Sequence, residues 1–263
     1  MQISGSTVLL TGATGGIGHA IARSLHAKGA KLVLTGRRTD VLEPLAAELG
    51  ARALAIDLSV AADVDRLVAE SGEVDILVAN AALPATGRLE SITMAEIDRM
   101  LDVNLRAPIA LAHALVPSMI ERGSGQLVFM SSLSGKTATP RTALYNASKF
   151  GLRGFASALR ADLHGSGIGV STIFPGFIRE AGMFADANVK LPTGIGTRSP
   201  EDVARAVEQA IEHNRGEIDV APFTLRVSTM FAGIAPELAA NMARRIGGDE
   251  VSRQLDEGHA GKR

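Results

Sequence analysis

The feature that most constrains the fold of this chain is a regular alternation of short apolar runs with amphipathic stretches. The runs are short and mostly apolar, which is typical of strands buried on both faces of a parallel sheet. They occupy residues 8–11, 31–35, 53–56, 76–79, 127–130, 170–174 and 218–220. Helical patterns separate them at residues 17–28, 41–49, 64–70, 94–120, 143–163 and 201–212. This order predicts right-handed crossovers and a doubly wound α/β sheet.

No linker rich in Gly, Ser or Pro divides the sequence, so residues 1–263 are predicted to form a single domain. Two segments interrupt the alternation. The first, about 176–199, contains Gly and Pro and follows the sixth strand, where ligands bind in open α/β sheets, so it is predicted to be a substrate lid. The second, 222–247, is apolar at helical spacing and is expected to cover the substrate cleft or form a subunit contact. We expect the polar residues after 247 to be frayed.

Charge and composition argue against several classes of protein. The chain has 27 Lys and Arg against 28 Asp and Glu, without a run of like charge, so nothing favours nucleic acid or anionic lipid as a partner. No basic region followed by an apolar stretch is seen, nor an apolar run long enough to span a bilayer, so we expect a cytoplasmic protein without membrane contact. With no Cys and six scattered His, no metal site is predicted.

The stretch TGATGGIG, residues 11–18, joins the first strand to the first helix. Glycines at this junction let the backbone turn tightly and let a pyrophosphate approach the positive end of a helix. Two spacings fit equally well, one using Gly12, Gly16 and Gly18 and the other using Gly12, Gly15 and Gly18. Either spacing predicts a dinucleotide site.

The end of the second strand indicates which dinucleotide is bound. A domain that binds NAD usually places Asp or Glu here, whereas this chain has Gly36 followed by Arg37 and Arg38. A guanidinium binds a 2′-phosphate through charge-assisted hydrogen bonds, so NADP (NADPH) is predicted in preference to NAD. Asp57 ends the third strand and is placed either to contact the adenine edge or to cap a helix.

Tyr145 is the only tyrosine of the chain, and Lys149 follows it four residues later. On a helix this spacing puts the phenol and the ammonium on one face. Ser132 lies 13 residues before Tyr145, although periodicity alone leaves Ser131 and Ser134 as competing hydroxyls. Asn104 precedes Pro108 by four residues in a helical pattern, so the proline should kink that helix and free the Asn104 carbonyl for water.

The combination of these motifs resembles the short-chain dehydrogenase/reductase family, in its single-domain branch. The resemblance runs in order from about residue 5 to about residue 221 and rests on Thr11-Gly12, Gly16-x-Gly18, Asn80-Ala81-Ala82, Asn104, Ser132, Tyr145-x-x-x-Lys149 and Pro175-Gly176. It implies a Rossmann-like, mostly parallel seven-stranded sheet with helices on both faces, a nicotinamide cofactor, and a homodimer or homotetramer. The catalytic residues that it implies are Asn104, Ser132, Tyr145 and Lys149. The cofactor-binding residues expected are Gly12, Thr14, Gly15, Gly16, Ile17, Gly18, Arg37, Arg38, Asp57, Leu58, Asn80, Ala81, Tyr145, Lys149, Pro175, Gly176 and Ile178.

Two positions depart from the pattern of that family. The family usually reads Asn-Asn-Ala-Gly after the fourth strand, whereas this chain has Ala79, Asn80, Ala81 and Ala82. The family also often has Thr four residues after the glycine of Pro-Gly, where this chain has Glu180, which can only accept hydrogen bonds when ionised. We therefore expect altered contacts beside the cofactor ribose and the nicotinamide carboxamide.

The predicted activity is reversible hydride transfer between NADP(H) and the carbonyl or secondary alcohol of a small molecule. Tyr145 would act as the acid or base and Ser132 would hydrogen-bond the reacting oxygen. Lys149, together with the positive charge of the oxidised nicotinamide, would lower the pKa of Tyr145 by about 2 to 3 units. Lys149 would also hold the ribose, and Asn104 would order a relay water. Apolar residues of the lid suggest a lipophilic substrate: Phe177, Ile178, Met183, Phe184, Val189 and Leu191.

Two other functions remain open at this point. A dinucleotide-binding sensor or scaffold without turnover would need the same glycine loop. Sugar-nucleotide epimerases and dehydratases use a similar fold with Tyr and Lys, but they resemble chains with a larger C-terminal substrate domain than the roughly 40 residues that follow the last strand here.

Overall fold

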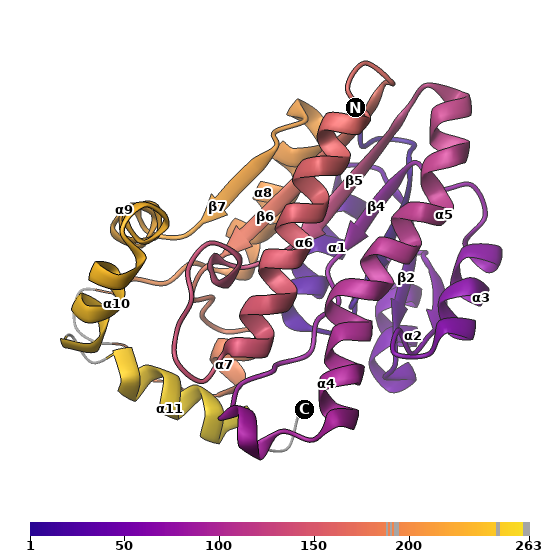
Figure 1. The fold of residues 1–263 in the computed structure, drawn as a ribbon. Helices are drawn as coiled ribbons and strands as arrows, with labels where there is room; N and C mark the ends of the chain where they lie inside the picture. Colours follow the sequence, from indigo (N-terminus) through magenta and orange to yellow (C-terminus); the bar gives the residue numbers. More distant parts are fainter. Residues whose placement is uncertain (188, 190, 192–194, 246–247, 260–263) are drawn as a thin grey trace.

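The fold is built around one seven-stranded parallel sheet (Figure 1). The computed structural model describes residues 1–187, 189, 191, 195–245 and 248–259. Within them the strand order is β3-β2-β1-β4-β5-β6-β7, and every neighbouring pair is parallel. The strands are β1 (Thr7–Thr11), β2 (Lys31–Gly36), β3 (Arg52–Ala55), β4 (Ile76–Ala79), β5 (Gly125–Met130), β6 (Ile168–Pro175) and β7 (Glu217–Val220). The predicted doubly wound, seven-stranded α/β fold is confirmed.

Helices cover both faces of the sheet and bury a separate apolar layer on each. One layer contains α1 (Gly16–Ala27), α2 (Thr39–Glu48) and α8 (Pro200–His213). The other contains α3 (Ala61–Ser71), α5 (Ala107–Arg122) and α6 (Ala143–Asp162). Strand order reverses between β1 and β4, because the chain leaves β3 to return beside β1. Ligand clefts in open α/β sheets form at such a reversal, outside the carboxyl ends of the strands.

The strands differ in burial according to their place in the sheet. Every residue of β5 and β6 is buried, as the continuous apolar runs predicted. The expectation of burial on both faces was wrong for β3, where Ala53 and Ala55 are exposed, and for β7, where Ile218 and Asp219 are only partly buried. Both are edge strands, so each has a neighbouring strand on one side only. Periodicity alone does not reveal where a strand lies in the sheet order.

The predicted long helix at 94–120 is a composite of three segments. It consists of α4 (Met94–Leu101), a π-helical turn (Asp102–Arg106) and α5, and the proline that was expected to disturb it, Pro108, lies at the start of α5. Pro108 has no N–H to donate to the Asn104 carbonyl, and the π-helical turn lies where this regular helical hydrogen bond is missing. This 29-residue stretch, Met94–Arg122, has the length and apolarity of a membrane span, contrary to our expectation from the sequence. Its apolar side is buried against the sheet through residues such as Leu111 and Met119.

The C-terminal part of the chain is helical throughout its described residues. After β7 come α9 (Phe223–Ile234), α10 (Pro236–Arg245) and α11 (Gly248–His259), which pass along one side of the molecule toward α7 (Gly182–Asp186) (Figure 1). The expectation of a frayed tail after 247 was wrong. Val251, Ser252 and Leu255 share one face of α11, and Ser252 is 3% exposed. The predicted lid and the segment 222–247 contain residues 188, 190, 192–194 and 246–247, which lie outside the described residues.

The hydroxyl of Thr11 joins β1 to the segment that follows β4. It accepts hydrogen bonds from the backbone N–H groups of Asn80 and Ala81, each at 3.0 Å. Thr11 itself is buried, with 1% of its surface exposed to solvent. Thr11→Val should therefore lower the free energy of unfolding by about 1–3 kcal/mol, because two buried donors lose their acceptor. Urea denaturation measures the change.

Thr35 provides a matched control on the neighbouring strand. It is equally buried, but its hydroxyl makes no hydrogen bond. Thr35→Val should leave the stability unchanged or raise it, because it removes a buried hydroxyl that has no partner. Equal losses in the two variants would contradict the assignment of the stabilising role to the Thr11 hydroxyl.

Candidate active site

The glycine loop between β1 and α1 is packed so closely that side chains have no room at three positions. A Cβ atom on Gly12 would lie 2.7 Å from the Ala81 Cα, and one on Gly18 would lie 2.2 Å from the Gly12 carbonyl oxygen. A Cβ on Gly16 would lie 2.4 Å from the Ala181 Cβ. Gly15 is less restricted, since its nearest neighbour would be 3.7 Å away. The geometry therefore favours the spacing of Gly12, Gly16 and Gly18, although Gly15 also faces the cavity.

A cavity of about 1690 Å³ opens at the carboxyl ends of the strands, and the predicted site residues meet there. All seventeen predicted cofactor-binding residues line it, from Gly12 of the glycine loop to Ile178 after β6. Ser132 lines it as well, whereas Asn104 does not. The first turn of α1 faces the same space, and its free N–H groups are suited to bind a pyrophosphate.

Charged residues surround the end of the cavity beside β2 and β3. Arg37 Nη1 lies 3.7 Å from Asp57 Oδ2, and the Arg38 guanidinium donates to the carbonyl oxygen of Thr14. Asp57 accepts hydrogen bonds from the N–H of Ser59 at 3.0 Å and from its hydroxyl at 2.7 Å. Burial raises the pKa of Asp57, but these hydrogen bonds and Arg37 outweigh it and leave the pKa below its usual value. Asp57 is therefore anionic, and it stabilises the turn before α3 rather than acting as the N-cap, which is Val60.

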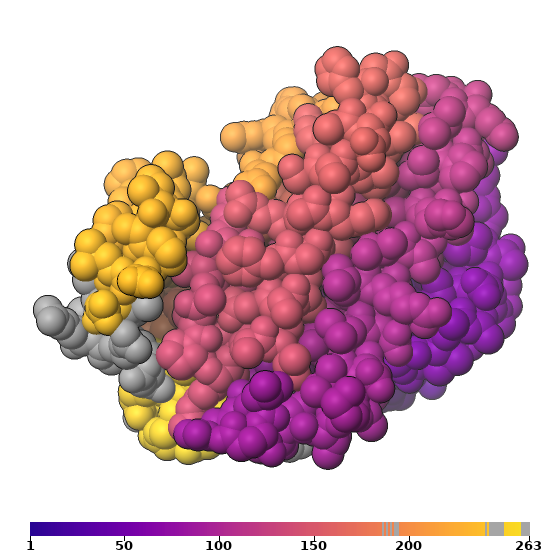
Figure 2. All heavy atoms as spheres, viewed as in Figure 1, coloured from indigo at the N-terminus to yellow at the C-terminus, as the bar shows by residue number. Residues whose placement is uncertain are grey.

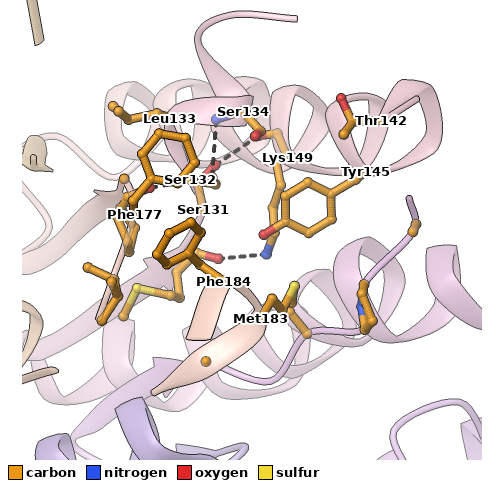
Figure 3. A pocket seen from close by; sticks show the side chains of 18 of the residues that line it. Ser131, Ser132, Leu133, Ser134, Thr142, Tyr145, Lys149, Phe177, Met183 and Phe184 are labelled. Carbon is orange, nitrogen blue, oxygen red and sulfur yellow. Dashed lines mark hydrogen bonds between the residues drawn. The ribbon is translucent and has the colours of Figure 1, made fainter. Parts of the chain in front are cut away.

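Tyr145 and Lys149 lie one turn apart near the start of α6 and face the cavity together (Figure 3). Lys149 is 1% exposed, and its Nζ donates to the Met130 carbonyl oxygen at 2.9 Å. The same Nζ is 5.6 Å from the centre of the Tyr145 ring. Met130 ends β5, so the lysine connects α6 to the strand that leads to Ser132.

The structure separates the three serines that follow β5. Ser131 is buried, and its hydroxyl donates to the Lys149 carbonyl oxygen at 3.1 Å. The Ser132 hydroxyl accepts the N–H of Ser134 at 3.1 Å and donates to the Pro175 carbonyl oxygen at 3.4 Å (Figure 3). Of the three, Ser132 is the one whose side chain acts to lower the pKa of Tyr145. The geometry therefore favours Ser132 as the partner of Tyr145, as the resemblance implied.

Asn104 has a different role from the other three polar residues. Its side chain is fully buried in the π-helical turn, where Oδ1 accepts the Leu83 N–H at 2.7 Å and Nδ2 donates to the Leu83 carbonyl oxygen at 2.9 Å. This pair of hydrogen bonds fixes the loop after β4, and Leu83 itself lines the cavity. Asn104 is thus a positioning residue through its side chain. A relay water at its carbonyl stays a prediction.

Burial controls the ionisation of the tyrosine and lysine pair. It raises the pKa of Tyr145 to about 12, against a smaller lowering by the hydrogen bond with Ser132. It also lowers the pKa of Lys149 to about 8. In the protein alone, burial therefore outweighs any lowering of the phenol pKa, and the lowering expected from Lys149 together with an oxidised nicotinamide stays a prediction. Desolvation disfavours both charged forms, so the protein alone holds a protonated phenol, which is the form that donates a proton.

Apolar side chains line the part of the cavity next to Tyr145. Phe177 and Phe184 pack with their ring centres 5.0 Å apart, and Met183 lies beside them (Figure 3). Ile178 also lines the cavity, whereas Val189 and Leu191 do not. Glu180, where the family often has Thr, is exposed and pairs with Arg179 at 2.9 Å. The backbone of Glu180 has φ of +69°, in the left-handed region, and the chain turns at this residue within the lid segment.

Sequence reasoning missed several residues that line the cavity. These are Thr86 after β4, Arg99 of α4, Lys136 after β5, and Val251, Ser252 and Leu255 of α11. Lys136 Nζ lies 2.6 Å from the Asp219 carboxylate and 2.9 Å from the Glu217 carboxylate. These two ion pairs join the loop that contains Ser132 to β7. The i, i+4 spacing of Val251 and Leu255 was an available signal for α11, as was the helical spacing of Glu250, Arg253 and Glu257.

Comparison with known proteins agrees with this geometry. The family model described as short chain dehydrogenase matches residues 6–192. The ketoacyl reductase HetN of Nostoc sp. is 36% identical over 227 residues, covering 83% of this chain and 79% of the relative. The mouse dehydrogenase/reductase SDR family member 7B is 32% identical over 259 residues, covering 89% and 78%. The chain therefore belongs to the short-chain dehydrogenase/reductase family, and it is an oxidoreductase of that family.

Solved structures of related proteins include nicotinamide dinucleotide complexes. A 3-ketoacyl-(acyl-carrier-protein) reductase from Brucella melitensis, complexed with NADH, is 29% identical with a TM-score of 0.75, covering 83% of this chain and 97% of that one. A short-chain dehydrogenase from Sphingobium yanoikuyae, complexed with NADPH, is 26% identical with a TM-score of 0.77, covering 89% and 94%. The glycine loop fits such a dinucleotide, because Gly12, Gly15 and Gly18 line the cavity beside the N-terminus of α1.

The catalytic assignment is tested by removing single oxygen atoms. Tyr145→Phe should lower kcat by at least about 10², the scale of a lost general acid, while NADPH affinity and folding stay nearly unchanged. Ser132→Ala should also lower kcat. Ser131→Ala, whose hydroxyl contacts backbone instead, is the matched control and should keep kcat near the parent value. Steady-state kinetics and NADPH fluorescence measure both quantities; a Phe variant with parental kcat would refute the assignment.

Rates in the two directions should depend differently on pH. Because burial raises the Tyr145 pKa to about 12, the phenol is protonated near neutrality, and carbonyl reduction should stay level from about pH 6 to 7, below the Lys149 pKa of about 8. Alcohol oxidation needs the phenolate, so its rate should rise with pH by up to about tenfold per unit below the pKa. Initial rates in both directions measure this. An oxidation rate independent of pH would contradict the role of Tyr145 as the base.

Proposed function

We propose that this protein transfers a hydride between NADP(H) and the carbonyl or secondary alcohol of a lipophilic small molecule. The observation that carries the proposal is the convergence of Ser132, Tyr145 and Lys149 on the cavity that the glycine loop borders. A bound nicotinamide supplies the hydride chemistry. The relatives that carry ketoacyl reductase in their names support a carbonyl as the substrate class.

In the proposed reduction, the residues of this chain orient the carbonyl and supply its proton. The Tyr145 hydroxyl donates the proton to the carbonyl oxygen, and its raised pKa keeps that proton in place at neutral pH. The Ser132 hydroxyl, which accepts the Ser134 N–H, turns its single proton from the Pro175 carbonyl oxygen to the same substrate oxygen. Lys149 is fixed against the Met130 carbonyl and would hold the ribose hydroxyls. In oxidation the same phenol accepts the proton.

The apolar wall of the cavity supports a lipophilic substrate. Phe177, Met183 and Phe184 come from the lid, and Leu225 and Phe231 come from α9. A carbonyl and alcohol panel read at the NADPH absorbance, ordered by increasing apolar area, tests this proposal. Rising kcat/KM with apolar area supports it, and a preference for charged or sugar substrates would overturn it.

We further propose that the protein forms a homodimer or homotetramer. Light scattering measures the oligomeric state.

The preference for NADP(H) is proposed from Arg37 and Arg38, which line the cavity where β2 ends. Arg37→Ala and Arg38→Ala should each raise the KM for NADPH by about tenfold or more, because hydrogen bonds to charged groups contribute about 1.5–3 kcal/mol. The KM for NADH should change little. Arg23→Ala is the control, since Arg23 pairs with Glu48 outside the cavity. Equal changes for both cofactors would contradict a 2′-phosphate contact.

Gly36→Asp is a less suitable test of the same preference. A Cβ at Gly36 would lie 2.7 Å from the Thr14 Cγ2 atom, so any side chain there displaces Thr14 from the glycine loop. A loss of NADPH binding in that variant would combine steric and electrostatic effects. The arginine variants remove a charge without adding volume, so they test the electrostatic effect separately from the steric effect.

A further inference from the structure

The C-terminal helix α11 forms part of the wall of the cavity at its substrate end. Val251, Ser252 and Leu255 line the cavity from one face of this helix. In Figure 1, α11 extends from α10 toward α7 and the segment that follows β4. Figure 2 shows the hollow that lies between these C-terminal helices and the body of the protein. The family model ends its match at residue 192, so α11 lies outside the matched residues.

One side of α11 rests on the lid. A Cβ atom on Gly258 would lie 2.6 Å from the Cα of Ala187, the residue that follows α7. The lid rests in turn on the cofactor loop, since a Cβ on Gly182 would lie 3.0 Å from the Ile17 Cδ1 atom. Close contacts thus run from α11 through α7 to the Ile17 side chain in the first turn of α1.

The other side of α11 is joined to the catalytic side of the cleft. Arg141 Nη1 lies 3.0 Å from Asp256 Oδ2, and the two side chains are 33% and 16% exposed. The Thr86 hydroxyl donates to the Leu255 carbonyl oxygen at 3.4 Å. Arg141 has φ of +60°, and its carbonyl oxygen accepts the Gly87 N–H at 2.7 Å, so it ties together the loops after β4 and before α6.

These contacts place α11 across the cleft, with the lid on one side and the loop before Tyr145 on the other. An ion pair that is largely shielded from water is screened less than a surface pair, so it holds a helix in one position more firmly. The position of α11 sets the distance between Val251 or Leu255 and the reacting residues. That distance limits the width of a molecule that can reach Tyr145.

We infer that α11 is the outer wall of the substrate subsite and that the Arg141–Asp256 ion pair determines how wide a substrate it admits. The inference rests on the proposed function, since it concerns selectivity at the same site. Arg141 and Asp256 are positioning residues in this scheme. They act through α11, while the cofactor end of the cavity, around Arg37 and Asp57, is independent of them.

The test uses the full chain with NADPH and two aryl ketones of different width, acetophenone and benzophenone. Asp256→Asn and Arg141→Gln should each raise the ratio of kcat/KM for benzophenone to that for acetophenone by about tenfold, the scale on which pocket size discriminates substrates. The double variant should show no larger effect than either single variant, because both break one pair. The KM for NADPH should stay at the parental value.

Arg253→Gln is the matched control on the same helix. Arg253 is exposed and pairs only within α11, with Glu250 at 2.6 Å and Glu257 at 2.6 Å, so the ratio should stay parental. Gly258→Val provides a second, independent variant, because its side chain would force α11 away from Ala187. It should also raise the ratio.

Specific results would overturn the inference. An unchanged ratio in folded Asp256→Asn and Gly258→Val would refute it, as would an equal change in Arg253→Gln. If the parent reduces no member of the carbonyl panel, the proposed function fails instead. The position of α11 is then tested by hydrogen exchange with NADPH present: faster exchange of α11 and of the loop before α6 in Asp256→Asn, but not in Arg253→Gln, supports the ion pair as the tether, and unchanged exchange refutes it.

Discussion

The close approach of β1, α1 and the segment after β4 is the constraint on which the rest of the site depends. Gly12 and Gly18 leave no room for a Cβ, and the Thr11 hydroxyl accepts two backbone N–H groups from residues 80 and 81. Because these contacts are made by backbone atoms, the position of the helix N-terminus is fixed at the reversal of strand order. These contacts therefore keep the N-terminus of α1 at the border of the cavity, where a pyrophosphate would bind.

Electrostatics at the other end of the cavity is governed by desolvation. Tyr145 and Lys149 are close together, yet burial moves the pKa of each toward its neutral form. Proximity of a cation lowers the pKa of a phenol only while the cation stays charged, and burial of the lysine weakens that condition. The protonated tyrosine suits reduction. In the opposite direction, the phenolate needs a further positive charge at the site, which an oxidised nicotinamide carries.

The sequence predicted the fold and most of the candidate site because both depend on local patterns. Continuous apolar runs identified the seven strands, and fixed spacings identified the glycine loop, Tyr145 and Lys149. It did not predict that β3 is an edge strand or that the Asn104 side chain holds Leu83, because both depend on contacts between distant segments. The sign of the Tyr145 pKa shift also depends on tertiary burial, which residue spacing does not report.

Helix α11 is the clearest example of a feature that local sequence patterns did not predict. Most residues of α11 are polar, so composition indicated a frayed tail, and one signal of order was the pair of apolar residues Val251 and Leu255. What orders the helix lies elsewhere in the chain: Arg141 before α6, Thr86 after β4 and Ala187 after α7. A short amphipathic helix is marginal alone and gains its stability from such tertiary contacts. The same contacts give it a position relative to Tyr145, so the interactions that order α11 also make it suited to select substrates.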